Sequence, residues 1–355
     1  MKFLMVGGTF DEQGGSPSGY VKKLCDALQM FTNQKIKVHN GGHFNQLSNI
    51  IKDDVIDFKV IFWFANVSND EEKLVKYIKQ INPECLLVTS KRNCGEYDLY
   101  AIIAKALALK SNLVLEINSS SQPFKATILD PLANVYLKDE SDINLIAINL
   151  LKRIRELQSF TRIGSEQVEG EAVIPDKQDF FEVIQAHADI FHSIIYNIQT
   201  TRFLGNASFR CVNGFPSFRN GNYIFVSRRN VEKKNLDVNG FVPVIADRID
   251  KVFYLGENKP SVDTPIQLRL YRFYPNINYM IHSHVYIKGA PITKSIIPCG
   301  AIEEFMEIVE MFPNPNETGF TVNLRGHGSL VLANSIDFFQ SIEYREKSER
   351  AEENE

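Results

Sequence analysis

The sequence predicts an α/β protein of two domains, the first with a mostly parallel, doubly wound sheet of the Rossmann type. Its 355 residues exceed one average domain. Residues 1–157 alternate apolar runs with amphipathic segments, the pattern of strands joined by helices. Residues 158–178 interrupt this alternation with a polar stretch rich in Gly and Glu, so we expect a linker there.

Each element of the first domain has its own signal. Apolar runs predict five strands, and helical spacing of apolar residues predicts four helices. The expected strands are Lys2–Val6, Lys35–His39, Asp57–Ala65, Cys85–Thr89 and Leu113–Ile117. The expected helices are Ser18–Met30, Asp70–Ile81, Asp98–Ala108 and Ser141–Leu157. An edge hairpin is expected within Lys125–Leu137.

The second domain is expected over residues 179–345. It opens with an apolar helix at residues 179–198 and continues with short strands separated by Asn/Gly turns. One such turn, Asn220-Gly221-Asn222, predicts a hairpin between Pro216–Phe218 and Tyr223–Val226. Residues 346–355 are almost all charged or polar, and we expect them to be a disordered tail.

Composition excludes several classes of protein. A net charge of -4 gives no general attraction to nucleic acid or to an anionic membrane. No apolar stretch approaches the roughly 20 residues needed to span a bilayer, and the apolar start reads as a buried strand. The five cysteines are scattered and form no Cys-x-x-Cys pair, so we expect a cytoplasmic protein without a disulfide framework.

Three histidines carry the strongest chemical signal. His282 and His284 end an apolar run, and alternate residues of a strand point to the same face. His327 lies between two glycines before another apolar strand. Three imidazoles with a carboxylate or water suit Zn²⁺ or another divalent metal. An isolated His-x-His pair is more often structural, and His187 and His192 on the apolar helix are interpreted that way.

The residues around these histidines resemble the class II aldolase/adducin superfamily. The segment from Pro260 to His284 has the family's order of a carboxylate, a helix and then His-x-His. Three more segments follow the family order: Phe203–Arg210, Phe225–Lys233 and Leu324–Leu332. The resemblance covers residues 179–340 and implies an α/β/α domain around an antiparallel sheet, commonly assembled as a homotetramer.

The resemblance also implies roles for individual residues. His282, His284 and His327 would bind the metal. The substrate phosphate would be held by residues of the glycine-asparagine turn and of two neighbouring loops: Gly205, Asn206, Ser208, Ser227, Arg228, Arg229 and Ser261. Asp263 would be a fourth ligand, as in the 4-epimerases, or a shortened version of the aldolases' acid/base glutamate.

Two departures from the family pattern leave alternatives open. The family's proton-donating tyrosine has no counterpart at the right spacing, so Glu303 and Glu304 are candidates for the acid/base, or they face solvent on a helix. Arg228-Arg229 replaces Pro-Ser in the phosphate loop. Two arginines would bind a more anionic substrate, such as a nucleotide-linked sugar, or they lie on an exposed loop.

The first domain has a glycine-rich loop between its first strand and first helix. Backbone N–H groups in such a loop can converge on a phosphate at a helix N-terminus. The candidate ligand residues of this loop are Gly7, Gly8, Thr9, Gly14, Gly15, Ser16, Ser18 and Gly19. Ser90 and Lys91 follow another strand at the same sheet edge. The loop matches no defined phosphate-binding motif, so an ordinary turn remains the alternative.

Together these observations predict a metal-dependent aldolase or epimerase. It would act on a phosphorylated sugar or nucleotide-linked sugar through an enediolate, with a nucleotide bound at the first domain. A non-catalytic, adducin-like assembly module fused to a nucleotide- or glycosyl-transferring first domain is the alternative. Adducin-like members lose metal ligands, whereas this chain retains all three histidines.

Overall fold

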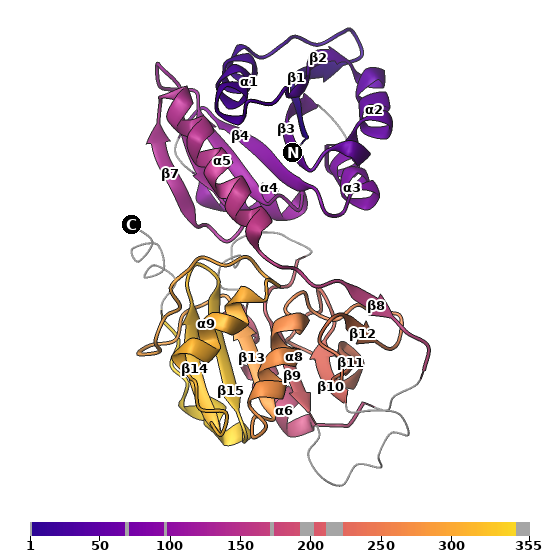
Figure 1. Ribbon diagram of the computed structural model, residues 1–355, viewed down its shortest axis with the longest axis vertical. Helices are drawn as coiled ribbons and strands as arrows, with labels where there is room; N and C mark the ends of the chain where they lie inside the picture. The colour runs from indigo at the N-terminus through magenta and orange to yellow at the C-terminus, as the bar shows by residue number, and fades with distance from the viewer. Residues whose placement is uncertain are drawn as a thin grey trace. The chain divides into compact units, whose positions relative to one another are not determined.

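The computed structural model describes residues 2–67, 71–95, 98–170, 174–191, 202–210 and 223–345. The chain forms two compact units (Figure 1). The first spans Met1–Leu157, and the second begins at Gln158. No helix among the described residues is both long and apolar enough to cross a membrane.

The first unit is built on a seven-stranded sheet in the order β2-β1-β3-β4-β5-β6-β7. The first five strands are parallel, as predicted, and β6 and β7 add the expected antiparallel hairpin at one edge. The strands are β1 (Phe3–Asp11), β2 (Lys37–His43), β3 (Val60–Val67), β4 (Leu86–Asn93), β5 (Leu113–Asn118), β6 (Lys125–Leu129) and β7 (Val135–Glu140).

Helices cover both faces of this sheet, which confirms the doubly wound class. Alternate residues of β1 face opposite layers: Met5 packs with α1 (Gly19–Thr32) and α5 (Ile143–Ser159). Leu4 packs with the other layer, formed by α2 (Phe44–Asp53), α3 (Glu71–Ile81) and η1 (Val55–Asp57). A smaller cluster joins α4 (Leu99–Ala108) to β5 and β6.

Two features of the first unit differ from the sequence prediction. Helix α2 was not predicted, although Leu47, Ile50 and Ile51 have helical spacing and are buried. Strand β4 extends to Asn93, so Ser90 and Lys91 lie within the strand instead of after it.

The second unit contains an eight-stranded sheet in the order β14-β15-β13-β9-β10-β11-β12-β8. All pairings are antiparallel except that of β12 with β8, which confirms the mainly antiparallel prediction. The strands are β8 (Ser165–Gln167), β9 (Asn206–Arg210), β10 (Tyr223–Ser227), β11 (Phe241–Ile245), β12 (Val252–Tyr254), β13 (Tyr279–Ser283), β14 (Gly319–Leu324) and β15 (Gly328–Ala333).

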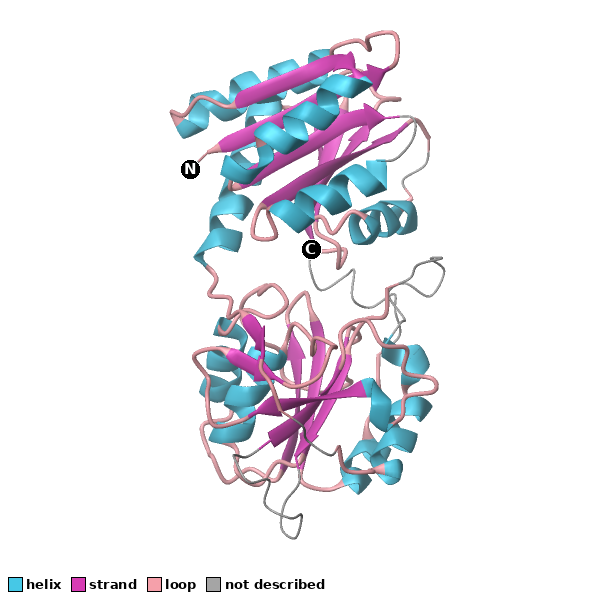
Figure 2. Ribbon diagram, turned by 90° about the vertical axis from the view of Figure 1, so that its right-hand side faces the viewer, coloured by secondary structure: helices cyan, strands magenta, loops and turns pink. Residues whose placement is uncertain are grey.

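Helices again lie on both faces (Figure 2). One layer holds α8 (Thr264–Phe273) and α9 (Glu303–Met311) over Met280 of β13. The opposite layer holds α6 (Gln178–Ala186), α7 (Ala188–Phe191) and η4 (Ile336–Ser341) over Ile281. A short 3₁₀ helix, η3 (Val238–Gly240), precedes β11.

Some predictions for the second unit need correction. Ser165–Gln167 lies in the segment expected to be a linker, yet it pairs with β12 at the sheet edge as β8. Three residues are too few to show strand periodicity. The helix expected at 179–198 is divided at His187 into α6 and α7. His192, the Pro216–Phe218 strand, the Asn220-Gly221-Asn222 turn and the tail at 346–355 lie outside the described residues.

Candidate functional site

Strand β13 directs His282 toward the layer of α8 and α9. Met280 faces this layer, and the strand's period of two places His282 on the same side. The His282 ring is 2% exposed, and its Nδ1 donates a hydrogen bond to the Ser329 carbonyl oxygen at 2.9 Å. This bond fixes the tautomer and leaves the Nε2 lone pair without a hydrogen-bond partner. Burial, reinforced by His327, lowers the pKa of His282 to about 4, so the ring is neutral at pH 7.

His327 reaches the same place from the turn between β14 and β15. Its flanking residues, Gly326 and Gly328, have φ values of 68° and 146°. A Cβ on Gly328 would lie 2.0 Å from the Ser283 carbonyl oxygen, so only glycine allows this close approach to β13. His327 is therefore placed by a turn that two glycines make possible.

Glu304, in the first turn of α9, orients the His327 ring. His327 Nδ1 donates to Glu304 Oε1 at 2.7 Å, and both side chains are buried. Burial raises the pKa of Glu304, and His327 opposes this effect. Burial alone would lower the pKa of His327, but Cys299 and Glu304 raise it well above its usual range. The carboxylate holds the hydrogen of Nδ1, and the ring turns its Nε2 away from Glu304.

The three histidine rings form one buried cluster. The centroid of His282 lies 5.0 Å from that of His284 and 4.6 Å from that of His327, and the third separation is 5.3 Å. Their ligand atoms all lie within 4.8 Å of one another. A tetrahedral zinc ion with Zn–N bonds of about 2.1 Å separates its nitrogens by about 3.4 Å. The three residues therefore fit a divalent metal with small movements, and the unpartnered Nε2 of His282 supports that fit.

Asp263 stands at the edge of this cluster, at the N-cap of α8. Its Oδ2 accepts a 2.7 Å hydrogen bond from Asn206 Nδ2 and lies 4.0 Å from His282 Nε2. Gln267 Nε2 in turn donates to Asn206 Oδ1. The other carboxylate oxygen of Asp263, Oδ1, is buried without a hydrogen-bond partner. This chain of amides aims the carboxylate at the histidines and leaves one oxygen available.

The residues expected to hold a phosphate divide into two groups. Three have polar side chains that are buried and engaged with the protein. Asn206 holds Asp263, Ser208 Oγ shares a 3.1 Å hydrogen bond with the Tyr271 hydroxyl, and Ser227 Oγ accepts from the Ala207 N–H. Gly205, Arg228, Arg229 and Ser261 lie on the loops beside them, with Ser261 N–H donating to the Ser227 carbonyl at 3.1 Å.

The two glutamates at the start of α9, Glu303 and Glu304, have different partners. Glu303 Oε1 accepts a hydrogen bond from the Thr161 N–H at 2.9 Å, so this side chain anchors the segment after Leu157. Only Glu304 bonds a histidine of the cluster among the glutamates proposed from sequence.

Sequence reasoning missed two residues next to the cluster. Cys299 Sγ lies 3.1 Å from His327 Nε2, and Asp263, Cys299 and His327 form a second group with ligand atoms within 4.8 Å of one another. Lys233 is 1% exposed, and its Nζ donates to the Leu204 carbonyl at 3.0 Å. Burial lowers the pKa of Lys233 to about 7. Neither residue belongs to a spacing motif, although Lys233 closes a segment singled out by resemblance.

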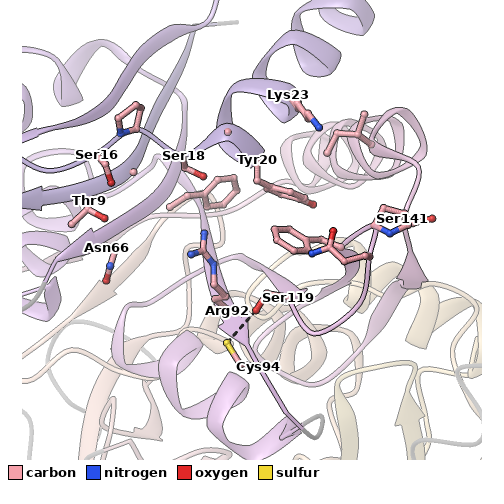
Figure 3. Close-up of a pocket in the computed structure, with 18 of the residues that line it drawn as sticks. Thr9, Ser16, Ser18, Tyr20, Lys23, Asn66, Arg92, Cys94, Ser119 and Ser141 are labelled. Carbon is pink, nitrogen blue, oxygen red and sulfur yellow. Dashed lines mark hydrogen bonds between the residues drawn. The ribbon is translucent and has the colours of Figure 1, made fainter.

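The first unit contains a cavity of about 930 Å³ at the carboxyl ends of its parallel strands (Figure 3). It borders β1 and β3, where the strand order reverses, the usual ligand position in open α/β sheets. Ser18 caps α1 by accepting a hydrogen bond from the Val21 N–H. Lys23 and Arg92 add two cationic side chains, and Tyr20 adds an aromatic ring.

Half of the residues predicted for this site line the cavity. The lining includes Gly8, Thr9, Ser16, Ser18 and Gly19. Gly7 packs on Val21, and Gly15 lies against Thr9 of β1 and donates its N–H to the carbonyl of Gly42 in β2. Gly14, Ser90 and Lys91 do not line the cavity, and Arg92 supplies the basic group from β4.

Comparison with protein families matches residues 185–287 to the class II aldolase and adducin N-terminal domain. The second unit thus contains a domain of the class II aldolase/adducin superfamily, which confirms the resemblance found in the sequence. No curated protein matches the chain.

Several solved structures are similar to parts of this chain. An L-fuculose 1-phosphate aldolase is 14% identical, with a TM-score of 0.32, and the match covers 50% of this chain and 84% of that one. The N-terminal class II aldolase domain of a Thermoplasma acidophilum protein is 17% identical, with a TM-score of 0.33 and coverage of 48% and 88%. The DNA/pantothenate metabolism flavoprotein of Streptococcus pneumoniae is 15% identical, with a TM-score of 0.35 and coverage of 45% and 99%.

Proposed function

We propose that the second unit is a metal-dependent lyase or epimerase that acts on a phosphorylated sugar or nucleotide-linked sugar through an enediolate. One observation carries this proposal: three buried imidazoles converge with ligand atoms within 4.8 Å of one another, and hydrogen bonds on Nδ1 of His282 and of His327 leave each Nε2 for a metal. Such anchoring is characteristic of metal-binding histidines. An adducin-like module without metal would have no use for it.

The histidines would hold Zn²⁺ or another divalent ion. When bound, such an ion supplies Lewis acidity that favours negative charge on a substrate oxygen. His282 needs no deprotonation at neutral pH, since burial already keeps the ring neutral. Glu304 fixes the ring plane of His327 by accepting a hydrogen bond from its Nδ1, so that Nε2 is the nitrogen available to a metal.

Asp263 is the residue we propose for proton transfer. It lies next to His282, it is held in one orientation by Asn206, and its Oδ1 has no hydrogen-bond partner. A general base must be positioned within reach of the substrate proton, and such a fixed carboxylate meets that condition. Burial lowers the pKa of Arg229, and the charge of Asp263 opposes this effect, so Arg229 brings positive charge near the same place. Arg229 would attract the anionic group of the substrate.

Metal content tests the first step. We expect about one equivalent of zinc or another divalent ion per chain in the purified protein, and its loss in a His282→Ala, His284→Ala double variant. His43→Ala is the matched control, because this histidine lies in the first unit, where its ring contacts Glu12. Equal metal content in all three proteins would overturn the proposal.

Product analysis tests the reaction. The metal-loaded protein is incubated with a panel of ketose phosphates, and the products are separated by mass and by configuration. Cleavage gives two smaller carbonyl compounds, whereas epimerisation leaves the mass unchanged. An Asp263→Asn variant should retain metal but lose turnover. Light scattering of the same protein tests the homo-oligomer that the resemblance to the superfamily implies.

We further propose that the cavity of the first unit binds a phosphate-bearing ligand, a nucleotide in the first instance. Two cationic side chains and a capped helix N-terminus border a cavity large enough for such a molecule. A nucleotide should raise the melting temperature of the protein, and Lys23→Ala, Arg92→Ala should abolish the shift. Lys22→Ala is the control, because Lys22 is exposed and does not line the cavity.

A further inference from the structure

Cys299 lies beside His327, one of the three histidines that would hold a metal ion. His327 Nδ1 is occupied by Glu304, so Nε2 is the only ring nitrogen of His327 that can bind a metal. The Cys299 sulfur lies 3.1 Å from this nitrogen. The possible ligand atoms of Cys299, Asp263 and His327 all lie within 4.8 Å of one another.

The loop that carries Cys299 is held in place by backbone contacts. The Ala301 N–H donates to the Pro298 carbonyl at 3.2 Å and closes a turn around the cysteine. Gly300 has a φ of 77°, and a Cβ there would lie 2.7 Å from the Val262 carbonyl oxygen. The turn therefore packs directly against the segment that leads into Asp263. These contacts fix the position of the turn.

The contact between Cys299 and His327 is close to the distance expected for two ligands of one zinc ion. Zn–N and Zn–S bonds of about 2.1 and 2.3 Å at the tetrahedral angle place the two donor atoms about 3.6 Å apart. A movement of the side chain by about 0.5 Å would bring the sulfur to that distance from His327 Nε2. Asp263 has one oxygen engaged with Asn206, and this hydrogen bond holds its carboxylate in place for another role.

We propose that the Cys299 thiolate is a ligand of the resting metal site, together with His282, His284 and His327. As the sulfur–metal bond forms, the thiol releases its proton to solvent and the site gains one negative charge. Asp263 is thereby left for proton transfer. The inference rests on the metal site proposed above and adds the sulfur ligand to it.

A sulfur ligand changes which metal the site prefers. Thiolate favours zinc and cobalt, whereas oxygen ligands suit magnesium and manganese. Cys299→Ser replaces the sulfur by a hydroxyl. The ratio of zinc affinity to manganese affinity should therefore fall by at least about tenfold in this variant, because a soft ligand is lost.

Cobalt substitution tests the proposal without any need for activity. Wild-type protein loaded with Co²⁺ should show an intense sulfur-to-cobalt charge-transfer band in the near ultraviolet. Cys299→Ser should bind cobalt but lose this band. Cys94→Ser should keep it, because Cys94 is an exposed cysteine of the first unit.

The outcomes separate the two proposals. One equivalent of cobalt without the charge-transfer band in the wild type would overturn the role of Cys299 and leave the histidine site intact. Failure of the wild type to bind cobalt or zinc would overturn both. X-ray absorption of the zinc-loaded wild type gives a second reading if Cys299→Ser does not fold: a sulfur scatterer at about 2.3 Å is expected, and a shell of nitrogen and oxygen alone refutes it.

Discussion

Replacement of Glu304 by glutamine should weaken metal binding far more than it weakens the fold. The carboxylate accepts a 2.7 Å hydrogen bond from His327 Nδ1 inside the protein. A neutral amide can still accept this bond, but it no longer increases the electron density on the inner ring nitrogen. Changes of this kind beside a metal-binding histidine typically reduce affinity by about 10- to 100-fold, or about 1.4–2.7 kcal/mol.

Glutamine can still accept the hydrogen bond from His327 Nδ1, so the variant exchanges a charged hydrogen bond for a neutral one. We therefore expect the unfolding free energy of metal-free Glu304→Gln to change by less than about 1 kcal/mol. Zinc competition with a chromophoric chelator at pH 7 measures the affinity, and urea unfolding of the metal-free protein measures the stability. Glu310→Gln is the control, since Glu310 lies on the same helix and pairs with exposed Lys294. An affinity within twofold of wild type would refute the role assigned to Glu304.

Three other predictions concern the surroundings of the site. Lys233 has a folded-state pKa of about 7, below its unfolded value of about 10.4. The unfolding free energy of the wild type should therefore rise between pH 7 and 10, by up to about 4–5 kcal/mol. Denaturant unfolding across that range should show no such rise for Lys233→Met. Gly205→Ala places a Cβ 2.3 Å from Phe191 Cδ1 and 2.7 Å from the His282 carbonyl oxygen, at a φ of 70°. This variant should lose about 2 kcal/mol or more of unfolding free energy. In the control Gly164→Ala the added Cβ meets open space, so the melting temperature should be unchanged. Removal of zinc by a chelator should lower the melting temperature of the wild type, and the His282→Ala, His284→Ala variant should show no such response.

The sequence was sufficient to find the elements whose periodicity is long or whose chemistry is local. Strand alternation placed His282 on one face of β13, and glycines flanking His327 indicated an unusual turn. The shortest strand was missed for a physical reason. The three residues of β8 are held by pairing with β12 at the sheet edge, and this contact leaves no periodic signal of its own. Helix α2 does have helical spacing, at Leu47, Ile50 and Ile51.

The contributions of Cys299 and Asn206 could not be found in this way. Cys299 enters the site because a glycine turn packs against Val262, a contact between segments that are distant in sequence. Asn206 lies in a segment that suggested a phosphate contact, yet the register of β9 with β13 places it directly opposite His282. Its side chain consequently bonds Asp263. Strand register is a property of the whole sheet, so no single motif encodes it.

This register also explains why the site tolerates so many buried polar groups. His282 on β13 lies between Asn206 of β9 and Leu330 of β15. The N-termini of α8 and α9 bring Asp263 and Glu304 to the same layer. Most of these groups are held by a neighbour from another element, and the unpartnered side-chain atoms at the site include His282 Nε2, Asp263 Oδ1 and Gln267 Oε1. Buried polar atoms without partners are costly, so a bound cation that satisfies His282 Nε2 should stabilise the second unit.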